Sequence, residues 1–325
     1  MEIIWESLTM PETMQAVTIH EFGDRDVLRL EAVPRPTPGP DEVLIRVHGS
    51  GINPIDYMTR SGLGVNRRWQ DVPFPVILGW DVSGVVEQSN SGAFNPGDEV
   101  YTFTHFPNPA GAYAEYIAAP AAEVAAKPAS VDHLTASGVP LAALTAWQAL
   151  FEAGDLQAGQ TILIHAVAGG VGHFAVQFAK WKGANVIGTA SARNEGFARE
   201  LGVDMFVDYT ACEFDEVVKD MDAVFHTIPA ELREKSWRTL KSDGVLMTIT
   251  GPMPEGEVEA QGGKRGSFVG VRPHAEQLTQ IAGLIDDGTI KVEIDSVLPL
   301  AEVARAHELV ESRHARGKVV LSVAG

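Results

Sequence analysis

The stretch that decides the fold is Thr161-Ile-Leu-Ile-His-Ala-Val-Ala-Gly-Gly-Val-Gly172. Its first part is apolar and β-branched, which predicts a strand over residues 161–167, and a glycine-rich turn follows. A helix is expected over residues 171–182, with Phe174 and Phe178 on its apolar face. A strand, a turn without side chains and a helix in this order are typical of a dinucleotide-binding unit.

This turn is suited to an anion. Without side chains the backbone can approach a pyrophosphate, and the first N–H groups of the helix are free to donate hydrogen bonds. Gly169, Gly170, Val171 and Gly172 are therefore predicted to line the pyrophosphate of a cofactor. The alternative is a tight strand-to-helix turn that binds no ligand.

Further strands and helices alternate downstream of this turn. The predicted strands cover residues 185–190, 205–208, 223–228 and 245–250, and the predicted helices cover 194–201, 214–220 and 230–240. Gly183, Gly202 and Gly244 are expected to close helices in the left-handed conformation. The alternation predicts an α/β fold with a doubly wound parallel sheet of the Rossmann type.

The flanking sequence has a different texture. From Met14 to about Ala126, short β-like runs alternate with Pro/Gly-rich segments, which predicts a β-rich domain. Helices at 276–286 and 301–312 and strands at 291–297 and 318–323 are expected to return to that domain. The predicted organisation is an N-terminal extension of residues 1–13, a β-rich domain of residues 14–127 plus 272–325, and a dinucleotide-binding domain of residues 128–271.

Composition excludes several classes of protein. The 325 residues carry a net charge of −18, which disfavours nucleic acid and anionic membranes as partners. No apolar run reaches the length of a membrane span, and the acidic start of the chain does not resemble a secretory signal. The single cysteine, Cys212, is interpreted as an incidental thiol in a cytoplasmic protein.

The second predicted strand indicates which dinucleotide binds. An acid at its end would accept the ribose 2′-hydroxyl of NADH, but this chain has Thr189-Ala-Ser-Ala-Arg-Asn194 there. Ser191 and Arg193 can instead bind a 2′-phosphate, so NADPH is the predicted cofactor. The alternative for Arg193 is a solvated residue at the start of a helix.

Four blocks carry a family resemblance. They are Gly51-Ile-Asn-Pro-Ile-Asp-Tyr-Met-Thr-Arg-Ser-Gly62, Gly111-Ala-Tyr-Ala-Glu-Tyr116, Pro140-Leu-Ala-Ala-Leu-Thr-Ala-Trp147 and Arg316-Gly-Lys-Val-Val-Leu321. They resemble the zinc-free quinone oxidoreductases, the zeta-crystallin-like family of the medium-chain dehydrogenase/reductase superfamily. The resemblance implies a GroES-like catalytic domain beside a Rossmann domain, a homodimer, and NADPH held between the two domains.

The same resemblance argues against a zinc site. Zinc-dependent relatives have Cys where this chain has Asn53, and Gly-His-Glu where it has Gly79-Trp80-Asp81. The cysteine-rich structural lobe is also missing, so no metal ligand is predicted. Without a Lewis acid, the favoured reaction is hydride transfer to an activated acceptor, namely a quinone or an α,β-unsaturated carbonyl.

The resemblance also implies roles for single residues. Asn53 and Tyr57 are the candidate catalytic residues, Asn53 near the nicotinamide ribose and the substrate pocket, and Tyr57 either stacking on the substrate or donating a proton to it. The alternatives are an Asn-Pro turn for Asn53 and simple packing for Tyr57. The remaining candidate cofactor contacts are Thr145, Tyr209, Ile228, Ile249, Phe268, Val269 and Lys318.

Alternatives stay open for several of these residues. Thr145 could hydrogen-bond its own helix, and Tyr209 could pack at an edge. Asp56 and Arg60, four residues apart, are interpreted as a structural ion pair. His226 stands where the family usually has Asp and is interpreted as a buried neutral histidine.

The functional prediction is hydride transfer from NADPH to a small-molecule quinone or enone. Within enzymes, the alternative is a 2-enoyl thioester or alkenal reductase that uses the same step. From another class, the alternative is an NADPH-binding sensor or structural protein with slow turnover.

Overall fold

The computed structural model describes residues 12–69 and 72–323. The predicted N-terminal extension therefore lies almost entirely outside the described residues. The helices are α1 (Pro54–Arg60), α2 (His133–Ser137), α3 (Pro140–Trp147), α4 (Gly172–Trp181), α5 (Glu195–Glu200), α6 (Phe214–Val217), α7 (Arg233–Trp237), α8 (Ala275–Asp286) and α9 (Val303–Glu311). Within these described ranges, no helix has both the length and the apolar character needed to cross a membrane.

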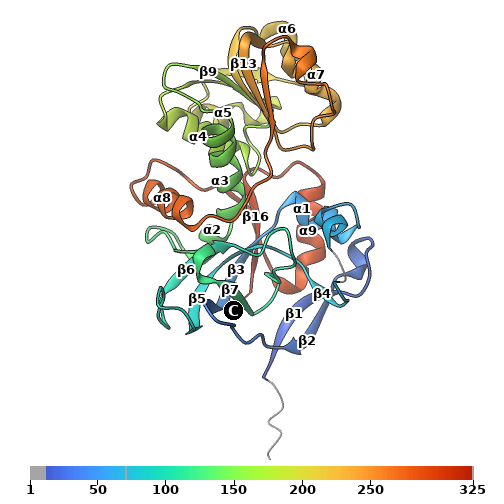
Figure 1. The fold of residues 1–325 in the computed structure, drawn as a ribbon, viewed down its shortest axis with the longest axis vertical. Coiled ribbons are helices and arrows are strands. Elements are labelled where there is room, and N and C mark those ends of the chain that lie inside the picture. The colour runs from blue at the N-terminus through green and yellow to red at the C-terminus, as the bar shows by residue number, and fades with distance from the viewer. Residues whose placement is uncertain (1–11, 70–71, 324–325) are drawn as a thin grey trace, which may run out of the picture.

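The glycine turn follows the third strand of a six-stranded parallel sheet, shown at the top of Figure 1. Helices α4 and α5 lie on one side of this sheet, and α6 and α7 lie on the other. Because the strand order reverses direction between β9 and β12, their carboxyl ends meet at the switch point of a doubly wound fold. In spatial order the strands are β11 (Met205–Asp208), β10 (Asn185–Ala190), β9 (Thr161–Ile164), β12 (Met221–His226), β13 (Leu240–Thr248) and β14 (Arg265–Phe268).

A mostly antiparallel sheet forms the other half of the molecule. Its central strand is β3 (Glu42–Gly51), and the last strand of the chain, β16 (Lys318–Ser322), pairs with it, so the tail returns to the β-rich part as predicted. The other strands are β15 (Ile294–Pro299), β5 (Asp81–Ser89), β6 (Glu99–Phe103), β8 (Val124–Ala126) and β7 (Tyr116–Pro120), with β1 (Thr13–Ile19), β2 (Arg29–Pro34) and β4 (Val76–Ile77) in a separate three-stranded sheet.

The two sheets are joined by a continuous core. Figure 1 shows α3 running between them, and this helix is buried along its whole length. Trp80 and Phe103 of the antiparallel half belong to the same apolar cluster as Phe174 and Phe225 of the parallel half. The hydroxyl of Tyr101 also donates to the carbonyl of Leu278 in α8. The predicted fold class, a Rossmann-type sheet with a GroES-like β-rich half, is confirmed.

Local boundaries differ from the predictions at several elements, for example α7, β12 and β13. The strand predicted over 161–167 ends at Ile164, because Ala166 adopts a left-handed backbone with φ of +50° to enter the turn. Gly183 and Gly202 have φ of +87° and +105°, as predicted for residues that close helices. Gly244 does not close a helix: α7 ends at Trp237, and Gly244 lies inside the extended strand β13.

Candidate functional site

The glycine turn is held together by its own backbone. The N–H of Gly169 donates to the carbonyl of Ala166 over 2.9 Å, which closes the turn directly after β9. A Cβ on Gly172 would lie 2.1 Å from that same carbonyl oxygen, so no other residue fits at this position. This steric need arises from the turn itself, whether or not a ligand is bound.

The start of α4 offers donors to an anion. In the described part of the chain, the N–H groups of Val171 and Gly172 have no hydrogen-bond partner. They stand at the N-terminus of a ten-residue helix, where the helix dipole also attracts negative charge. The turn therefore has the geometry and the free donors that a pyrophosphate requires.

Three predicted contacts for the adenosine end lie where β10 and β11 finish. Ser191 follows β10 directly, and the guanidinium of Arg193 donates to the carbonyl of His314 over 3.1 Å. Tyr209 follows β11, donates its N–H to Ala190, and is 58 % exposed. The structure thus brings a hydroxyl, a guanidinium and an exposed aromatic ring to one edge of the sheet.

One acid also lies at this edge. Asp208 ends β11 and pairs in register with Ala190 at the end of β10. Its carboxylate accepts hydrogen bonds from the N–H and the hydroxyl of Thr210, and these bonds lower its pKa. Asp208 is therefore bound by its own loop, although its charge remains close to the residues predicted to hold a 2′-phosphate.

The predicted nicotinamide contacts come from the next three strands. Ile228 lies two residues beyond β12, and Ile249 directly follows β13, where its N–H donates to the carbonyl of His226. Phe268 ends β14, and Val269 donates its N–H to Thr248 over 2.8 Å. All four therefore lie at the carboxyl ends of adjacent strands, with half-buried or partly exposed side chains.

The return segment connects the glycine turn to the antiparallel half. Gly317 forms an isolated parallel bridge with Gly169, and its N–H donates to Ala168 over 2.9 Å. A Cβ on Gly170 would lie 3.0 Å from the side chain of Lys318. Lys318 therefore packs directly against the turn that is predicted to hold the cofactor.

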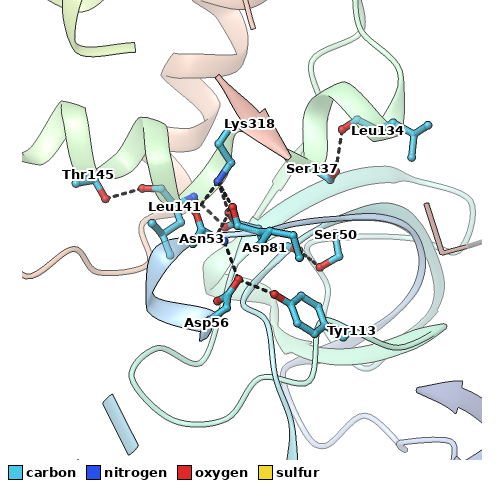
Figure 2. A network of polar contacts seen from close by, with 11 residues as sticks. Ser50, Asn53, Asp56, Asp81, Tyr113, Leu134, Ser137, Leu141, Thr145 and Lys318 are labelled. Atoms are coloured by element: carbon cyan, nitrogen blue, oxygen red, sulfur yellow. Dashed lines mark hydrogen bonds and ion pairs between the residues drawn. The ribbon is translucent and has the colours of Figure 1, made fainter. Parts of the chain in front are cut away.

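Figure 2 shows that the ammonium group of Lys318 points toward Asn53. Its Nζ donates to Asn53 Oδ1 over 2.5 Å and to the carbonyl of Ile52 over 2.9 Å. The Asn53 Nδ2 in turn donates to Asp81 Oδ2 over 2.9 Å. Asn53 is thus oriented by residues distant in sequence.

Asp81 connects this cluster to α3. Its second oxygen accepts the N–H of Leu141 over 2.9 Å, at the start of that helix (Figure 2). Burial raises the pKa of Asp81 to about 6, although the Lys318 ammonium 3.9 Å away lowers it. Burial likewise lowers the pKa of Lys318, whereas Asp81 and Asp56 raise it. The positive charge of Lys318 therefore offsets only part of the cost of burying the Asp81 carboxylate.

The predicted ion pair between Asp56 and Arg60 is wrong. Asp56 turns back to the start of α1, where its Oδ2 accepts the N–H of Asn53 and the hydroxyl of Tyr113, each over 2.7 Å. Arg60 instead pairs with Glu311 of α9 over 2.8 Å and contacts His307. Capping the first turn of the helix satisfies a buried N–H, which an ion pair along the helix would not do.

Two further candidates have simple local surroundings. The hydroxyl of Thr145 donates to the carbonyl of Leu141 over 2.7 Å within its own helix, so it can only accept a hydrogen bond from a ligand. Tyr57 is half-buried on α1. Among the described residues, its hydroxyl has no hydrogen-bond partner, so it is free to act on a ligand.

His226 is fully buried, and burial lowers its pKa to about 4. The prediction of a buried neutral histidine is therefore confirmed. Cys212 is exposed, with its thiol near the carbonyl of Asp208. In the described ranges, no group of three His, Cys, Asp or Glu side chains is arranged to hold a metal ion.

Sequence reasoning missed Asp81 and Tyr113 as members of the site. Asp81 had a signal, because it stands in the Gly79-Trp80-Asp81 block that replaces a metal-binding motif. Tyr113 lies in one of the four family blocks, but nothing in the sequence indicates its contact with Asp56. Two surface hollows, one beside Arg35 and Tyr116 and one beside Trp181 and Phe197, include no residue of the glycine turn.

Comparisons with known proteins agree with this geometry. The model of the alcohol dehydrogenase GroES-like domain matches residues 39–129, and that of the zinc-binding dehydrogenase family matches residues 201–321. The NAD(P)H oxidoreductase RTN4IP1, mitochondrial, of Danio rerio is 32% identical over 95% of this chain and 91% of its own length. The chloroplastic NADPH-dependent alkenal/one oxidoreductase of Arabidopsis thaliana is 32% identical over 96% of this chain and 80% of its own length.

A solved structure is similar along the whole chain. The quinone oxidoreductase from Coxiella burnetii superposes with a TM-score of 0.90 and 35% identity, over 96% of this chain and 100% of that one. The relatives and this structural neighbour are oxidoreductases, and two of their names include the reduced nicotinamide cofactor. The chain therefore belongs to the quinone oxidoreductase family of the medium-chain dehydrogenases/reductases and is an oxidoreductase that uses a nicotinamide cofactor.

Proposed function

We propose that this enzyme transfers hydride from NADPH to a quinone or an α,β-unsaturated carbonyl without zinc. The observation that carries the proposal is the contact between the glycine turn and Lys318, whose ammonium group orients Asn53. Through the side chain of Lys318, this contact links the glycine turn, where the anion is proposed to bind, to the side-chain amide of Asn53. A cofactor whose pyrophosphate lies on the turn could then place its reactive end near Asn53.

The chain's own residues bind and orient this cofactor. Val171 and Gly172 would donate their free N–H groups to the pyrophosphate, with Gly169 and Gly170 leaving room for it. Ser191 and Arg193 would hold the 2′-phosphate, with Tyr209 beside them. Ile228, Ile249, Phe268 and Val269 would form the apolar surroundings of the nicotinamide, which supplies the hydride when bound.

Asn53 has the groups to orient either reactant. Its Nδ2 has a second N–H, and its Oδ1 a second lone pair, beyond the bonds to Asp81 and Lys318. Thr145 would accept a hydrogen bond from the carboxamide of the cofactor. Tyr57 would donate the proton that completes the reduction, because its hydroxyl has no partner among the described residues. The protein mainly positions the two reactants.

Zinc independence rests on the types of residue present. Asn53 offers a neutral amide where a zinc enzyme has a thiolate, and the indole N–H of Trp80 donates to the carbonyl of Asn108 over 2.7 Å. Asp81 accepts hydrogen bonds from Asn53 and Leu141. An ammonium group 3.9 Å from Asp81 also opposes a second cation there.

The acceptor is proposed from the relatives. One carries the name alkenal/one oxidoreductase and a structural neighbour the name quinone oxidoreductase, which favours conjugated carbonyl compounds in general. A 2-enoyl thioester reductase would use the same hydride step. Binding of NADPH without turnover would instead make the chain a sensor or structural protein.

The test is a stopped-flow comparison of NADPH and NADH oxidation with quinones, enones and enoyl thioesters, in buffer with and without a chelator. NADPH-selective turnover that the chelator does not change supports the proposal and identifies the acceptor class. Tight NADPH binding without turnover on any acceptor would refute it in favour of the binding protein.

Assembly and location are also proposals. Within residues 12–69 and 72–323, the edge strands β11 and β14 of the parallel sheet have one unpaired side each, and pairing through such an edge would give the expected homodimer. Light scattering after size exclusion tests this. The cytoplasmic location is tested by fractionation, since the relatives above include chloroplastic and mitochondrial proteins.

A further inference from the structure

Hydrogen bonds connect four side chains that come from β10, the end of β9, α7 and β12. His165 Nδ1 lies 3.0 Å from the hydroxyl of Thr189, and its Nε2 lies 3.1 Å from the hydroxyl of Ser236. The same Ser236 hydroxyl lies 2.9 Å from Nδ1 of His226. All four residues are at most 2 % exposed. We call Thr189, His165, Ser236 and His226 the hydroxyl–imidazole chain.

The hydroxyl–imidazole chain spans the whole length of the proposed site. Thr189 lies near the end of β10, two residues before Ser191, and its hydroxyl also accepts the N–H of Ala166 at the start of the glycine turn. His165 follows β9, and His226 ends β12, two residues before Ile228. The adenosine, pyrophosphate and nicotinamide ends are therefore backed by one set of hydrogen bonds.

The positions of the protons follow from counting donors. Burial lowers the pKa of His165 to about 3 and that of His226 to about 4, so each ring is neutral near pH 7 and carries one proton. If His165 donated to Thr189, the Thr189 hydroxyl would have no acceptor among the described residues. A buried hydroxyl without a partner is costly, so Thr189 donates to His165.

The rest of the direction follows step by step. With its Nδ1 accepting, His165 carries its proton on Nε2 and donates to Ser236. The Ser236 oxygen accepts this hydrogen bond, so its single hydroxyl proton is donated to Nδ1 of His226. The proton of His226 must therefore be on Nε2. The reverse direction would leave both the Thr189 hydroxyl and His226 Nε2 unpaired, whereas this direction leaves only His226 Nε2.

The hydroxyl–imidazole chain ends at His226 Nε2, beside the segment that carries Ile228. His226 Nε2 is buried and has no hydrogen-bond partner among the described residues. The backbone groups of Pro229 and Ile228 raise the pKa of His226 against the effect of burial, which indicates that their carbonyls lie close to its ring. The segment is also held from its other side, where the hydroxyl of Thr227 donates to the carbonyl of His165 over 2.8 Å.

We propose that the hydroxyl–imidazole chain fixes the Thr227–Pro229 segment, and that His226 is its positioning residue, presenting an Nε2–H donor to the carbonyls that set Ile228 against the nicotinamide. This inference rests on the proposed function for the identity of the ligand. His226 does not touch the reacting atoms and acts through the segment beside it.

The first test needs no variant. Nitrogen-15 NMR of the histidine rings in the wild-type protein reports which ring nitrogen carries the proton. The inference requires the Nε2–H form for both His165 and His226, assigned by the signals lost in His165→Asn and His226→Asn. An Nδ1–H form of His226 would overturn it.

The second test separates the two ends of the His226 ring. In His226→Gln the amide reaches the position of Nε2 and keeps a donor toward the segment, whereas in His226→Asn it reaches only the position of Nδ1. The probe is reduced nicotinamide mononucleotide, with its intrinsic fluorescence followed in a titration. We expect the dissociation constant to be about tenfold higher for His226→Asn than for His226→Gln, which corresponds to roughly 1.4 kcal/mol.

Two controls complete the design. Adenosine 2′,5′-bisphosphate, which probes only the adenosine end, should bind both variants within about twofold of each other, within the normal scatter of such values. Thr102→Val removes a hydroxyl bond from a buried residue to the carbonyl of Glu123 in the antiparallel half, away from the chain, and reports the effect of destabilisation alone. Equal affinity of the two His226 variants for the mononucleotide would overturn the inference.

These outcomes are distinct from failure of the proposed function. If the wild-type enzyme binds NADPH but reduces no acceptor, the proposed reaction is wrong, while the tautomer and affinity tests still decide the role of His226. If the wild-type enzyme turns over and the two variants do not differ, only the inference fails.

Discussion

Replacing Asp56 by Asn should stabilise this enzyme most at alkaline pH, with a gain that shrinks as pH falls toward 4. Asp56 is fully buried, and burial raises its pKa from the ordinary 3.8 to about 7. Its Oδ2 accepts two hydrogen bonds, but its Oδ1 has no partner among the described residues. An amide fits this arrangement, since its oxygen can accept both bonds and its NH₂ group can take the place of the protonated oxygen.

The sign follows from proton linkage. The folded state holds the Asp56 proton more tightly than the unfolded state, so this group contributes most stability below pH 3.8 and loses it as pH rises toward 7. At roughly 1.4 kcal/mol for each pH unit, the upper bound of the loss is about 4 kcal/mol. Relaxation and water entry around the ion reduce this cost, so a gain of about 2 kcal/mol at pH 8 is the expected size for Asp56→Asn.

Urea unfolding at pH 5, 6.5 and 8 measures this difference. The difference in stability between the wild type and Asp56→Asn should be smallest at pH 5 and should widen as pH rises. Asp132→Asn is the matched control, because the Thr135 N–H lowers the pKa of Asp132, so that its stabilising effect is lost as pH falls. If Asp56→Asn were less stable than the wild type by the same amount at pH 5 and pH 8, the reasoning about a buried neutral acid would be refuted.

Other perturbations test the rest of the site. Gly172→Ala should abolish NADPH binding in a calorimetric titration, because its Cβ would lie 2.1 Å from the Ala166 oxygen, whereas Gly196→Ala has open space and should bind normally. Arg193→Ala should reduce the preference for NADPH over NADH in kcat/KM about tenfold or more, through loss of a charge-assisted bond to the 2′-phosphate; an unchanged ratio would mean that Arg193 is a solvated residue. Lys318→Met should destabilise the protein by about 3–5 kcal/mol in urea unfolding, because it leaves the buried Asp81 without its cation; a loss below about 1 kcal/mol would show that Asp81 is already neutral in the wild type. Dialysis against a chelator should leave turnover unchanged, and restoration of lost activity by zinc would contradict the metal-free proposal.

The part of the site that follows from sequence is the part encoded locally. The glycine turn, the absence of an acid at the end of β10 and the alternation of strands and helices all depend on residues close together in the chain. Local backbone chemistry suffices for such features, because a strand that runs into glycines and then into a helix has few other arrangements.

The polar cluster around Asn53 could not be derived in this way. Its members Asn53, Asp81 and Lys318 come from three distant segments, and the pairing of β3 with both β5 and β16 brings them together. Spacing was misleading for Asp56 and Arg60, since four residues apart on a helix permits an ion pair but does not require one. Tertiary packing gave each of them a better partner elsewhere.

The position of β16 in the middle of its sheet has a consequence for biosynthesis. Of the described strands it is synthesised last, yet it lies between β15 and β3, which was made early. Until Lys318–Ser322 is made, residues Gly49–Gly51 of β3 lack this partner, and a chaperone or another nascent chain could pair with them. Synthesis of β16, and not completion of the parallel sheet, is therefore the step that covers this part of β3.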